Sequence, residues 1–536
     1  MAELLQGSVF LRVLRAIIAF FCRMAADSTV FRAVGRCWRS SRTHSWLFRR
    51  LGADDRFVQN AKTTALFSRL NAALGRCKAP VRCWEDSLPG RVWHAVVHCG
   101  KNSRLLSWLF SDGMNGILLV LIGLYVGIDW FLRDVLPIPA LGSVWDEALM
   151  LFCVLWIVWQ RFDRKTPIAA KANPLDLPVL IFIAVSAVLM CVVSPYPNIQ
   201  FTGFRATVQY LLWFFLITRL LQSDEDFMRL YLAMLALAVV ISLHGIYQYI
   251  TRAPMPAKWV AAAETAVRTR VYSIFGSPNI MGDYMVMFVP MTVALAYHTK
   301  KKSLQLAAWL AAIVMCVACL FTMSRGAWVA MAVTIVLFIL LVDKRLFLVL
   351  LAGICVLVLI PFVRTRIGFL FTDDFVAANT NGGRAGRWAL GLEHLASADP
   401  LTGFGFGMFG GAVAMQNQVL DHVEYFYMDN YYLKILVETG WLGLGSFILM
   451  LLGMIVCACR SLFRTAKDRR EERPMYPLTA GMFSGLVGVL VHCYFENIFE
   501  EPYMMVCFWV IAAMIVYTGF LRKSYKNIEN TLEAQK

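Results

Sequence analysis

The segment "YFYMDNYYLKILVETGWLGL", residues 425–444, places four polar side chains at the start of a long apolar run. They are Asp429, Asn430, Lys434 and Glu438. An ionisable group inside such a run is a functional candidate by default, because burying a charge in an apolar medium is costly. Structural roles are also open: Asp429 can cap the helix, Lys434 can extend to the surface, and Glu438 can be buried against an arginine.

A set of arginines forms the second group of residues that could do chemistry. A guanidinium presents five donors in a planar fork that matches phosphate oxygens, so clustered arginines at an apolar boundary indicate an anionic ligand. Several of these arginines lie between apolar runs, on the side opposite to the basic loops described below: Arg205, Arg252, Arg268, Arg270, Arg325, Arg364, Arg366, Arg384 and Arg387.

Arg325 occupies a very short turn between two apolar runs, in "FTMSRGAWVA". Its two interpretations, a phosphate contact and an extension to lipid headgroups, are evenly balanced. Arg270 precedes a turn, "FGSPN", that leads into a helix whose free N-terminal amides favour anions, although an ordinary capped turn explains the same residues. Together with Arg205 and Arg384, these two residues are the candidates for binding an anion.

Between these runs, "GGRAGRWALGLEHLASADPLTGFGFGMFGG" predicts a helix over Arg384–Ala396 followed by a glycine-rich turn. Arg384 and Trp388 share one face of that helix. Gly403 and Gly405 allow backbone to lie close to a ligand, although a flexible loop accounts for the glycines equally well. We therefore expect Trp388, Gly403, Gly405 and Asn430 to position the loop and an acceptor.

The sequence contains no nucleotide-binding loop and no zinc-protease motif in a credible context, so neither a cofactor nor a metal is expected. Cys316 and Cys319 form a C-x-x-C pair inside an apolar run, with no second pair to complete a metal site. Core packing is the better interpretation of the two thiols.

The composition defines the elements that must position these groups. The 536 residues are 59% hydrophobic and 16% charged, with a mean hydropathy of +0.61, which excludes an ordinary soluble domain. We expect an all-α polytopic membrane protein with about twelve transmembrane helices. The runs centre on 115–131, 145–159, 177–193, 206–221, 230–250, 280–297, 304–321, 327–342, 346–363, 431–459, 476–496 and 503–520.

Basic clusters at 161–165, 298–303, 343–345, 460–473 and 521–526 fall on one side of these runs. The positive-inside rule makes that side cytoplasmic, so that both termini are cytoplasmic and one large loop is external. The predicted organisation is an interfacial or cytoplasmic segment 1–110, transmembrane helices 1–9 over 111–363, the external loop 364–430, helices 10–12 over 431–520, and a cytoplasmic tail 521–536.

Residues 1–110 are rich in arginine and tryptophan and contain no run long enough to span a membrane. Arg12 and Arg15 interrupt the first apolar stretch, which disfavours a cleaved signal peptide. Basic amphipathic helices on an anionic membrane surface explain the segment better than binding to nucleic acid, because it carries too much apolar surface for a solvated arm.

With these residues in view, the chain resembles the O-antigen ligase and O-antigen polymerase superfamily of bacterial envelope glycosyltransferases over roughly residues 110–520. The segments "RVYSIFGSPN", "SRGAW", "PLTGFGFGMF" and "DNYYLKILVETGWLGL" are similar to recurring family segments in the same order. Ligases of this family carry Arg-x3-Leu in the periplasmic loop; here Trp388 stands in place of the leucine after Arg384.

The family's second motif has histidine, then Asn, Ser or Gln, nine residues and glycine. This chain has Asp429, Asn430, nine residues and Gly440, so Asp429 occupies the histidine position. The resemblance implies Asp429, Glu438 and His422 as catalytic candidates, with Glu424 as a further substitute for the histidine.

The resemblance also implies an activity. A glycan would pass with inversion from undecaprenyl diphosphate to an acceptor glycan or lipid A-core at the periplasmic face of the inner membrane, without metal or nucleotide. Arginines would stabilise the leaving diphosphate and a carboxylate would accept the proton. The alternatives are polymerisation of repeat units, glycosylation of proteins, and, in a different class, transport of lipid-linked oligosaccharide. The expected partners are the lipid-linked glycan, its acceptor and membrane lipids, and no nucleic acid.

Overall fold

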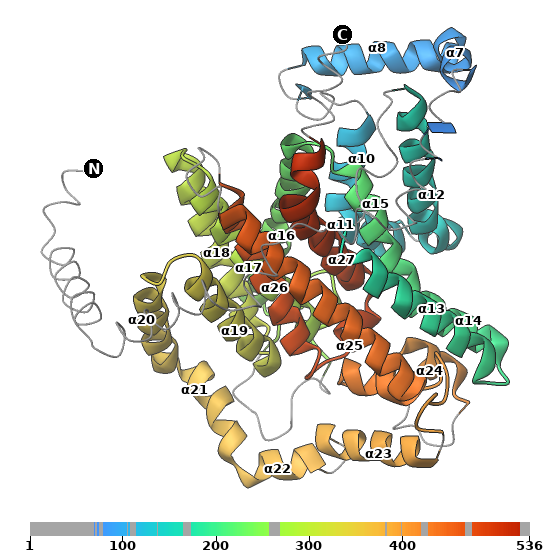
Figure 1. Ribbon diagram of the computed structural model, residues 1–536. Helices are drawn as coiled ribbons and strands as arrows, with labels where there is room; N and C mark the ends of the chain where they lie inside the picture. Colours follow the sequence, from blue (N-terminus) through green and yellow to red (C-terminus); the bar gives the residue numbers. More distant parts are fainter. Residues whose placement is uncertain are drawn as a thin grey trace, which may run out of the picture.

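A computed structural model describes residues 79–103, 114–136, 138–163, 173–256, 269–380, 383–397, 399–419, 427–466 and 474–525, with isolated positions between 69 and 107. Every regular element in these ranges is helical, as the composition predicts. The helices pack into one bundle, with shorter helices across both of its ends (Figure 1).

Seven helices of the described chain are long and apolar enough to cross a membrane. They are α12 (Pro139–Asp163), α16 (Asp224–Thr251), α17 (Pro278–His298), α18 (Lys302–Phe321), α25 (Tyr431–Thr465), α26 (Met475–His492) and α27 (Pro502–Val516), which continues through η8 (Tyr517–Leu521). Two bent pairs raise the number to nine: α10 (Met114–Gly123) with α11 (Tyr125–Trp130) and η1 (Phe131–Val135), bent by 71°, and α20 (Leu346–Leu359) with α21 (Pro361–Gly368) and η4 (Phe369–Phe371), bent by 85°.

The predicted number of about twelve spans is therefore not confirmed. The helices α13 (Asp176–Val192) and α19 (Arg325–Leu341) are apolar but have only 17 residues each. The run at 206–221 is divided among α14 (Pro197–Val208), η2 (Gln209–Leu211) and α15 (Leu212–Leu220). A hydropathy window sums side chains and does not detect breaks in the helix, which explains the higher predicted number.

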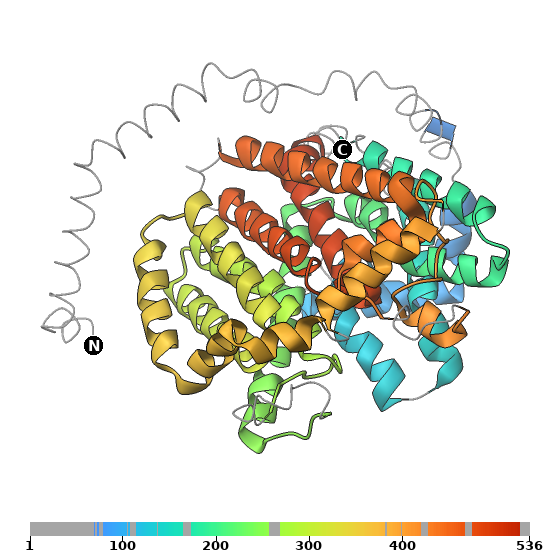
Figure 2. The same cartoon turned by 90° about the horizontal axis from the view of Figure 1, so that it is seen from below.

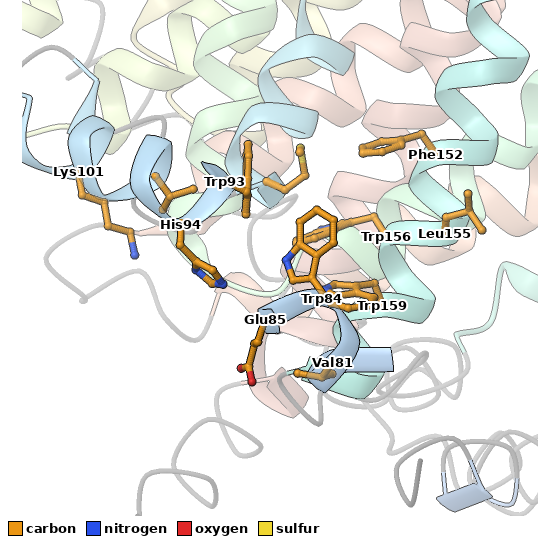
Figure 3. A pocket seen from close by; sticks show the side chains of 12 residues that line it. Val81, Trp84, Glu85, Trp93, His94, Lys101, Phe152, Leu155, Trp156 and Trp159 are labelled. Atoms are coloured by element: carbon orange, nitrogen blue, oxygen red, sulfur yellow. The ribbon is translucent and has the colours of Figure 1, made fainter. Parts of the chain in front are cut away.

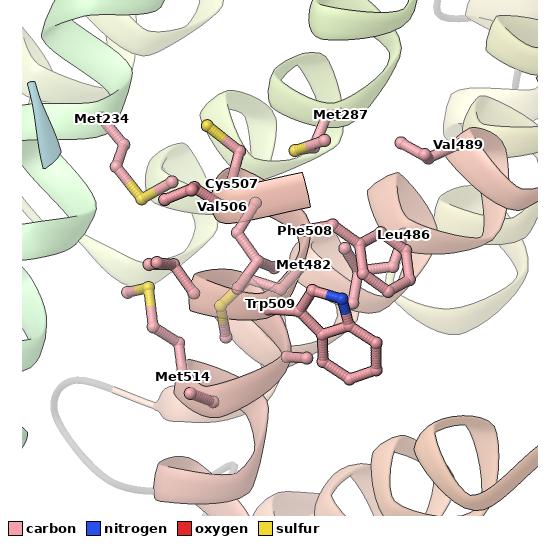
Figure 4. Close-up of a cluster of buried hydrophobic side chains, with 14 of the residues drawn as sticks. Met234, Met287, Met482, Leu486, Val489, Val506, Cys507, Phe508, Trp509 and Met514 are labelled. Carbon is pink, nitrogen blue, oxygen red and sulfur yellow. The ribbon is translucent and has the colours of Figure 1, made fainter. Parts of the chain in front are cut away.

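The bundle core surrounds α27, whose membrane-length stretch is 94% buried within the protein. Met234 of α16, Met287 of α17 and Met482 of α26 lie in the same buried cluster as Phe508 and Trp509 of α27 (Figure 4). Flexible methionine side chains fill the irregular spaces between rigid aromatic rings.

Glycines let α26 lie directly on α17. A Cβ added to Gly481 would lie 2.6 Å from the carbonyl oxygen of Pro290 and 3.1 Å from the Cα of Met291, so only glycine permits this distance. Small residues serve the same purpose in helix pairs throughout membrane proteins, where close backbone packing replaces hydrophobic burial as the source of stability.

One end of the bundle, here called the basic end, collects the helix termini next to the predicted basic loops. Arg522 after η8 donates from Nε to Asp224 at the start of α16 at 2.8 Å. His298 at the end of α17 contacts the carbonyl oxygen of Pro474 at 3.1 Å, and Tyr476 donates to the carbonyl oxygen of Leu341 at 2.9 Å. The helices α7 (Ala79–Asp86) and α8 (Leu88–Asn102) lie across this end (Figure 1).

The opposite end, here called the loop end, carries the segment predicted as the large external loop. This segment contains α22 (Asp373–Thr380), α23 (Arg384–Ser397) and α24 (Ala412–Asn417). The predicted helix Arg384–Ala396 is confirmed as α23, with one further residue. Figure 2, viewed from this side, shows α21 to α23 running across the bundle.

Candidate functional site

Asp429 is the centre of a group of side chains at the loop end. Its Oδ2 accepts hydrogen bonds from Arg384 Nε at 2.8 Å and from Arg387 Nη2 at 2.7 Å, and its Oδ1 accepts from Trp388 Nε1 at 3.2 Å. All three donors lie on α23, at positions i, i+3 and i+4, so one face of that helix is turned toward the carboxylate. The Asp429 side chain is only 3% exposed.

Asn430, not Asp429, caps α25. The Asn430 side-chain oxygen accepts a hydrogen bond from the amide of Leu433 at 3.1 Å, which satisfies one of the free amides of the first turn. Asp429 therefore does not cap α25, although capping was the simplest structural role for it. Its carboxylate instead joins the loop helix to the start of a long membrane helix.

Arg384 presents the free donors of the site. Its Nε is bound to Asp429, but its two terminal amino groups have no hydrogen-bond partner among the described residues, and 37% of its side chain is exposed. A guanidinium held by Nε keeps four N–H donors on its two terminal amino groups, and two of them form its outer edge. This is a geometry suited to an incoming anion.

Arg387 connects Asp429 to a second carboxylate. Its guanidinium lies 5.6 Å from the ring centre of Tyr427, whose hydroxyl donates to Glu496 Oε1 at 2.8 Å. Desolvation of the hydroxyl and the Glu496 carboxylate both raise the pKa of Tyr427 above its ordinary value, so the hydroxyl remains a donor. The other carboxylate oxygen of Glu496 accepts from Asn279 at the start of α17.

Arg270 is bound to protein groups in the same region. It donates from Nη2 to Asn279 Oδ1 at 3.0 Å and from Nε to the carbonyl oxygen of Thr322 at 3.0 Å. It is 7% exposed. Arg270 thereby fixes the start of α17 to the end of α18.

The turn that carries Arg325 is held by two other arginines. Arg270 binds Thr322, and Arg366 donates from Nε to the carbonyl oxygen of Met323 at 3.1 Å. Ser324 then caps α19 through the amide of Ala327. The Arg325 guanidinium lies 5.5 Å from the ring centre of Phe369, so Arg325 is presented from a rigid turn at the loop end.

Glu438 lies one layer deeper and faces the glycine-rich turn rather than Asp429. Its Oε1 accepts from the amides of Gly407 at 2.9 Å and Phe409 at 3.3 Å, and its side chain is 1% exposed. Lys434 lies 3.6 Å from Glu438 Oε2 and bonds to Glu500 Oε2 at 2.6 Å. These contacts give Glu438 a positioning role in the resting structure.

The glycines of the turn lie close to other protein atoms. The sequence predicts a close approach of the backbone at these glycines, but to a ligand. A Cβ on Gly403 would lie 2.6 Å from both the Gly440 amide nitrogen and the Val437 carbonyl oxygen. Gly440 has φ 61° and ψ −166°, a conformation reached almost only by glycine, and it bends α25 at this point. Gly405 lies against the Gln200 side chain of α14.

Some predicted residues do not join this group. Arg205 is bound to Glu147 of α12 and to Gln209, away from Asp429. His422 and Glu424 lie outside the described residues. Within the described residues, no group of three or more His, Cys, Asp or Glu side chains could hold a metal ion.

The structure adds Tyr427, Asn279 and Glu496, which the sequence did not single out as site residues, and it places Arg387, one of the arginines named from the sequence, beside Asp429. Arg387 had a detectable signal, since its spacing from Arg384 and Trp388 places all three on one helical face. Tyr427 and Glu496 come from segments 69 residues apart, and no local pattern predicts their contact.

These features define a class: a helical membrane protein with an arginine-rich site at one end of its bundle, beneath a helix of a connecting loop. Residues 310–448 match the family model described as O-antigen ligase. The match includes Arg325, α23, the glycine-rich turn and Asp429, and it confirms the resemblance to the O-antigen ligase-related superfamily. No curated protein matches the chain.

The match indicates an O-antigen ligase- or polymerase-type function. Proteins of this type are glycosyltransferase-like enzymes of bacterial polysaccharide biosynthesis, which act in membranes on lipid-linked glycans and their acceptors. Arg270, Asn279 and Glu496 lie outside the matched segment, although they belong to the same spatial group.

Proposed function

We propose that the protein transfers a glycan from undecaprenyl diphosphate to an acceptor hydroxyl, with inversion and without a metal ion, at the loop end of the bundle. The observation that carries this proposal is the geometry of Arg384, which is held through Nε by Asp429 and keeps its terminal amino groups available for an anion. That edge of a guanidinium matches two phosphate oxygens.

The arginines act on the leaving group. As the bond between the sugar carbon and the phosphate oxygen breaks, negative charge grows on the diphosphate, and preorganised donors lower the energy of that state. Arg384 binds the diphosphate from the loop helix, and Arg325 binds it from the α18–α19 turn. Arg270 and Arg366 hold that turn in place.

Asp429 takes the proton of the acceptor hydroxyl as its oxygen attacks the sugar carbon. Oδ2 already accepts two hydrogen bonds, whereas Oδ1 accepts one from Trp388 and keeps a second lone pair. A base on the face of the sugar opposite the diphosphate gives inversion. The same carboxylate therefore orients Arg384 and Arg387 and accepts the proton.

The positive-inside rule supports a periplasmic position for the loop end. The described helix ends beside the predicted basic loops gather at the other end of the bundle. With the basic end cytoplasmic in the inner membrane, the site faces the compartment where lipid-linked glycans are joined to their acceptors.

The test is turnover by the purified full-length protein in detergent, with a lipid-diphosphate-linked repeat unit as donor. A product that requires added lipid A-core identifies a ligase, and a ladder that grows from the donor alone identifies a polymerase. A polypeptide acceptor tests protein glycosylation. Detergent removes the sealed compartment that a transporter requires, so absence of any product, together with donor movement across vesicles, would overturn the enzymatic proposal in favour of transport.

A further inference from the structure

A cavity at the basic end lies far along the bundle from Asp429 and takes no part in the proposed transfer. Its volume is about 530 Å³. It lies between the α7–α8 pair and the spans α10 and α12, and is lined mainly by aromatic and aliphatic side chains, including Trp84, Trp93, Phe152, Leu155, Trp156 and Trp159 (Figure 3).

One wall of the cavity is continuous with the apolar surface of α12. Phe152 is 43% exposed and Leu155 is 57% exposed, and their neighbours Leu151 and Val154 are 60% and 45% exposed. Such a surface on a membrane-length helix contacts lipid chains. The cavity is therefore open sideways to the hydrocarbon, and an acyl chain can enter it from the bilayer.

The other wall is built by α8. One stripe of side chains on this helix lines the cavity, and a second stripe is exposed. Trp93, Val97 and Lys101, spaced by four residues, line the cavity. Leu88 and Val92 form part of a second stripe and are 76% and 55% exposed. A helix across the end of a membrane bundle that carries an apolar stripe with no partner among the described residues is suited to the interface between headgroups and chains.

The polar groups of the cavity are arranged as a headgroup site. In Figure 3, the indoles of Trp84, Trp156 and Trp159 lie close together, with His94 and, farther out, Lys101 to one side of them. Glu85 also lines the cavity. Indole rings are typical of the level of the headgroups, and a lysine there attracts anionic lipids.

From these observations we propose that the cavity binds one acyl chain of an anionic glycerophospholipid, whose phosphate lies at Lys101. The bound lipid fills the space between α8 and α12 and thereby attaches the N-terminal segment to the bundle. This site is independent of the proposed transfer reaction, since none of its residues contacts the Asp429 group.

The experiment uses the full-length protein in phosphatidylcholine nanodiscs that contain a minor fraction of phosphatidylglycerol with a photoreactive diazirine near the end of one chain. After irradiation, peptide mass spectrometry locates the labelled residues. We expect labels within 81–101 and 152–159, in excess over those on other lipid-facing residues, such as Val188 and Val240.

Two pairs of variants test the site. Val97→Trp fills the cavity and should abolish the excess labelling, whereas Val96→Trp makes the same change on an adjacent residue that does not line it and should leave the labelling intact. Lys101→Gln should reduce the preference for phosphatidylglycerol over a phosphatidylcholine probe by about fivefold, and Arg91→Gln, which lies outside the cavity, should not.

Equal labelling in the Val97→Trp and Val96→Trp proteins would overturn the proposal, because it would identify ordinary surrounding lipid. An unchanged lipid preference in Lys101→Gln would remove the headgroup site. Absence of lipid label together with a dimer that Val97→Trp dissociates would assign the groove to a second copy of the chain, and would overturn the proposal as well.

Discussion

At the scale of single residues, Asp429 has two proposed roles: it holds the arginines of the site, and it accepts the proton of the acceptor hydroxyl. It binds two arginines and a tryptophan from a helix that ends more than thirty positions earlier in the chain. The resemblance described above implies that it stands where ligases carry a histidine. A neutral histidine could not pair with both arginines. The aspartate therefore couples the proposed base to the anion-binding groups more tightly than a histidine would.

We expect Asp429→Asn to insert and fold normally, because Asn430 holds the helix cap and an amide oxygen can still accept one hydrogen bond from α23. The transfer rate should fall by roughly 10²- to 10⁴-fold, the usual contribution of general acid–base catalysis. Asp429→His should retain part of the activity, with a pH dependence moved toward the histidine pKa of about 6.5. Rate measurements across pH test both.

A wild-type rate for Asp429→Asn would show that the residue is not the base, and would direct attention to His422 or Glu424. An active Asp429→His protein whose rate keeps the wild-type pH dependence would assign Asp429 to holding Arg384 and Arg387 alone. Thermal unfolding in detergent is the control that separates either result from misfolding.

Arg384→Lys should lower the transfer rate by about 10- to 100-fold, because it removes one of the two proposed hydrogen bonds to the diphosphate. A hydrogen bond to a charged group contributes about 1.5–3 kcal/mol. A lysine keeps the charge beside Asp429 but has no second edge of donors. Arg345→Lys is the control, because Arg345 is an exposed arginine at the basic end, away from the Asp429 group. Equal rates for both variants and wild type would exclude a bidentate contact by Arg384.

The sequence predicts the residue types of this site better than their partners. Ionisable side chains beside apolar runs identify Asp429, Arg384 and Trp388, because such groups are rare at a membrane boundary. The sequence also places Glu438 and Asp429 in one polar group, yet their side chains face different neighbours. The Asp429 side chain faces α23, and the Glu438 side chain faces the glycine-rich turn. This difference arises from the bend at Gly440 and the docking of the loop.

At the scale of elements, the bend in α25 fixes the glycine-rich turn. The amide of Phe404 donates to the carbonyl oxygen of Val437 at 3.0 Å and the amide of Gly405 to that of Glu438 at 2.7 Å, so the turn binds the carbonyl groups that the bend releases from the helix. Gly440 is therefore a backbone requirement for docking of the glycine-rich turn in this protein.

We expect Gly440→Ala to destabilise the protein by about 1–3 kcal/mol, the cost of this backbone conformation for a residue with a side chain. The new Cβ would also overlap the backbone of Leu401 and Thr402. Limited proteolysis should cut the 399–419 segment faster. Gly445→Ala, in the same helix with open space around the new Cβ, should instead be neutral or stabilise by up to about 1 kcal/mol.

Equal midpoints of thermal unfolding for the two glycine variants would contradict this role of the bend. Sequence patterns predict α23 well, because its first turn follows two glycines and its polar and apolar residues alternate with helical spacing. They fail at 206–221, where one apolar run is divided among three short elements.

At the scale of the whole molecule, the two ends of the bundle differ in charge and in shape. The basic end carries α8 and the lysine-rich turn before α18, and the loop end carries the arginines that face the proposed substrate. The pattern of basic loops along the chain predicts which end is cytoplasmic, because these loops alternate with the apolar runs, and this sidedness stays a prediction.

A cysteine introduced at Arg364 should react with a membrane-impermeant maleimide in cells whose outer membrane is permeabilised. A cysteine at Lys301 should react only after the inner membrane is broken, because it lies in the turn between α17 and α18 at the basic end. The wild-type protein gives the background from its native cysteines. The reverse pattern of labelling would invert the proposed orientation and place the site on the cytoplasmic side.

The central position of α27 has a consequence for biosynthesis. α27 is the last of the described membrane-length helices to be translated, yet it is the most buried of them. Met234, Met287 and Met482 gain their final neighbours only when residues 502–525 have left the ribosome. We therefore expect the earlier helices to insert into the bilayer before their packing is complete. A chain truncated before residue 502 should remain loosely packed and should be degraded by membrane proteases.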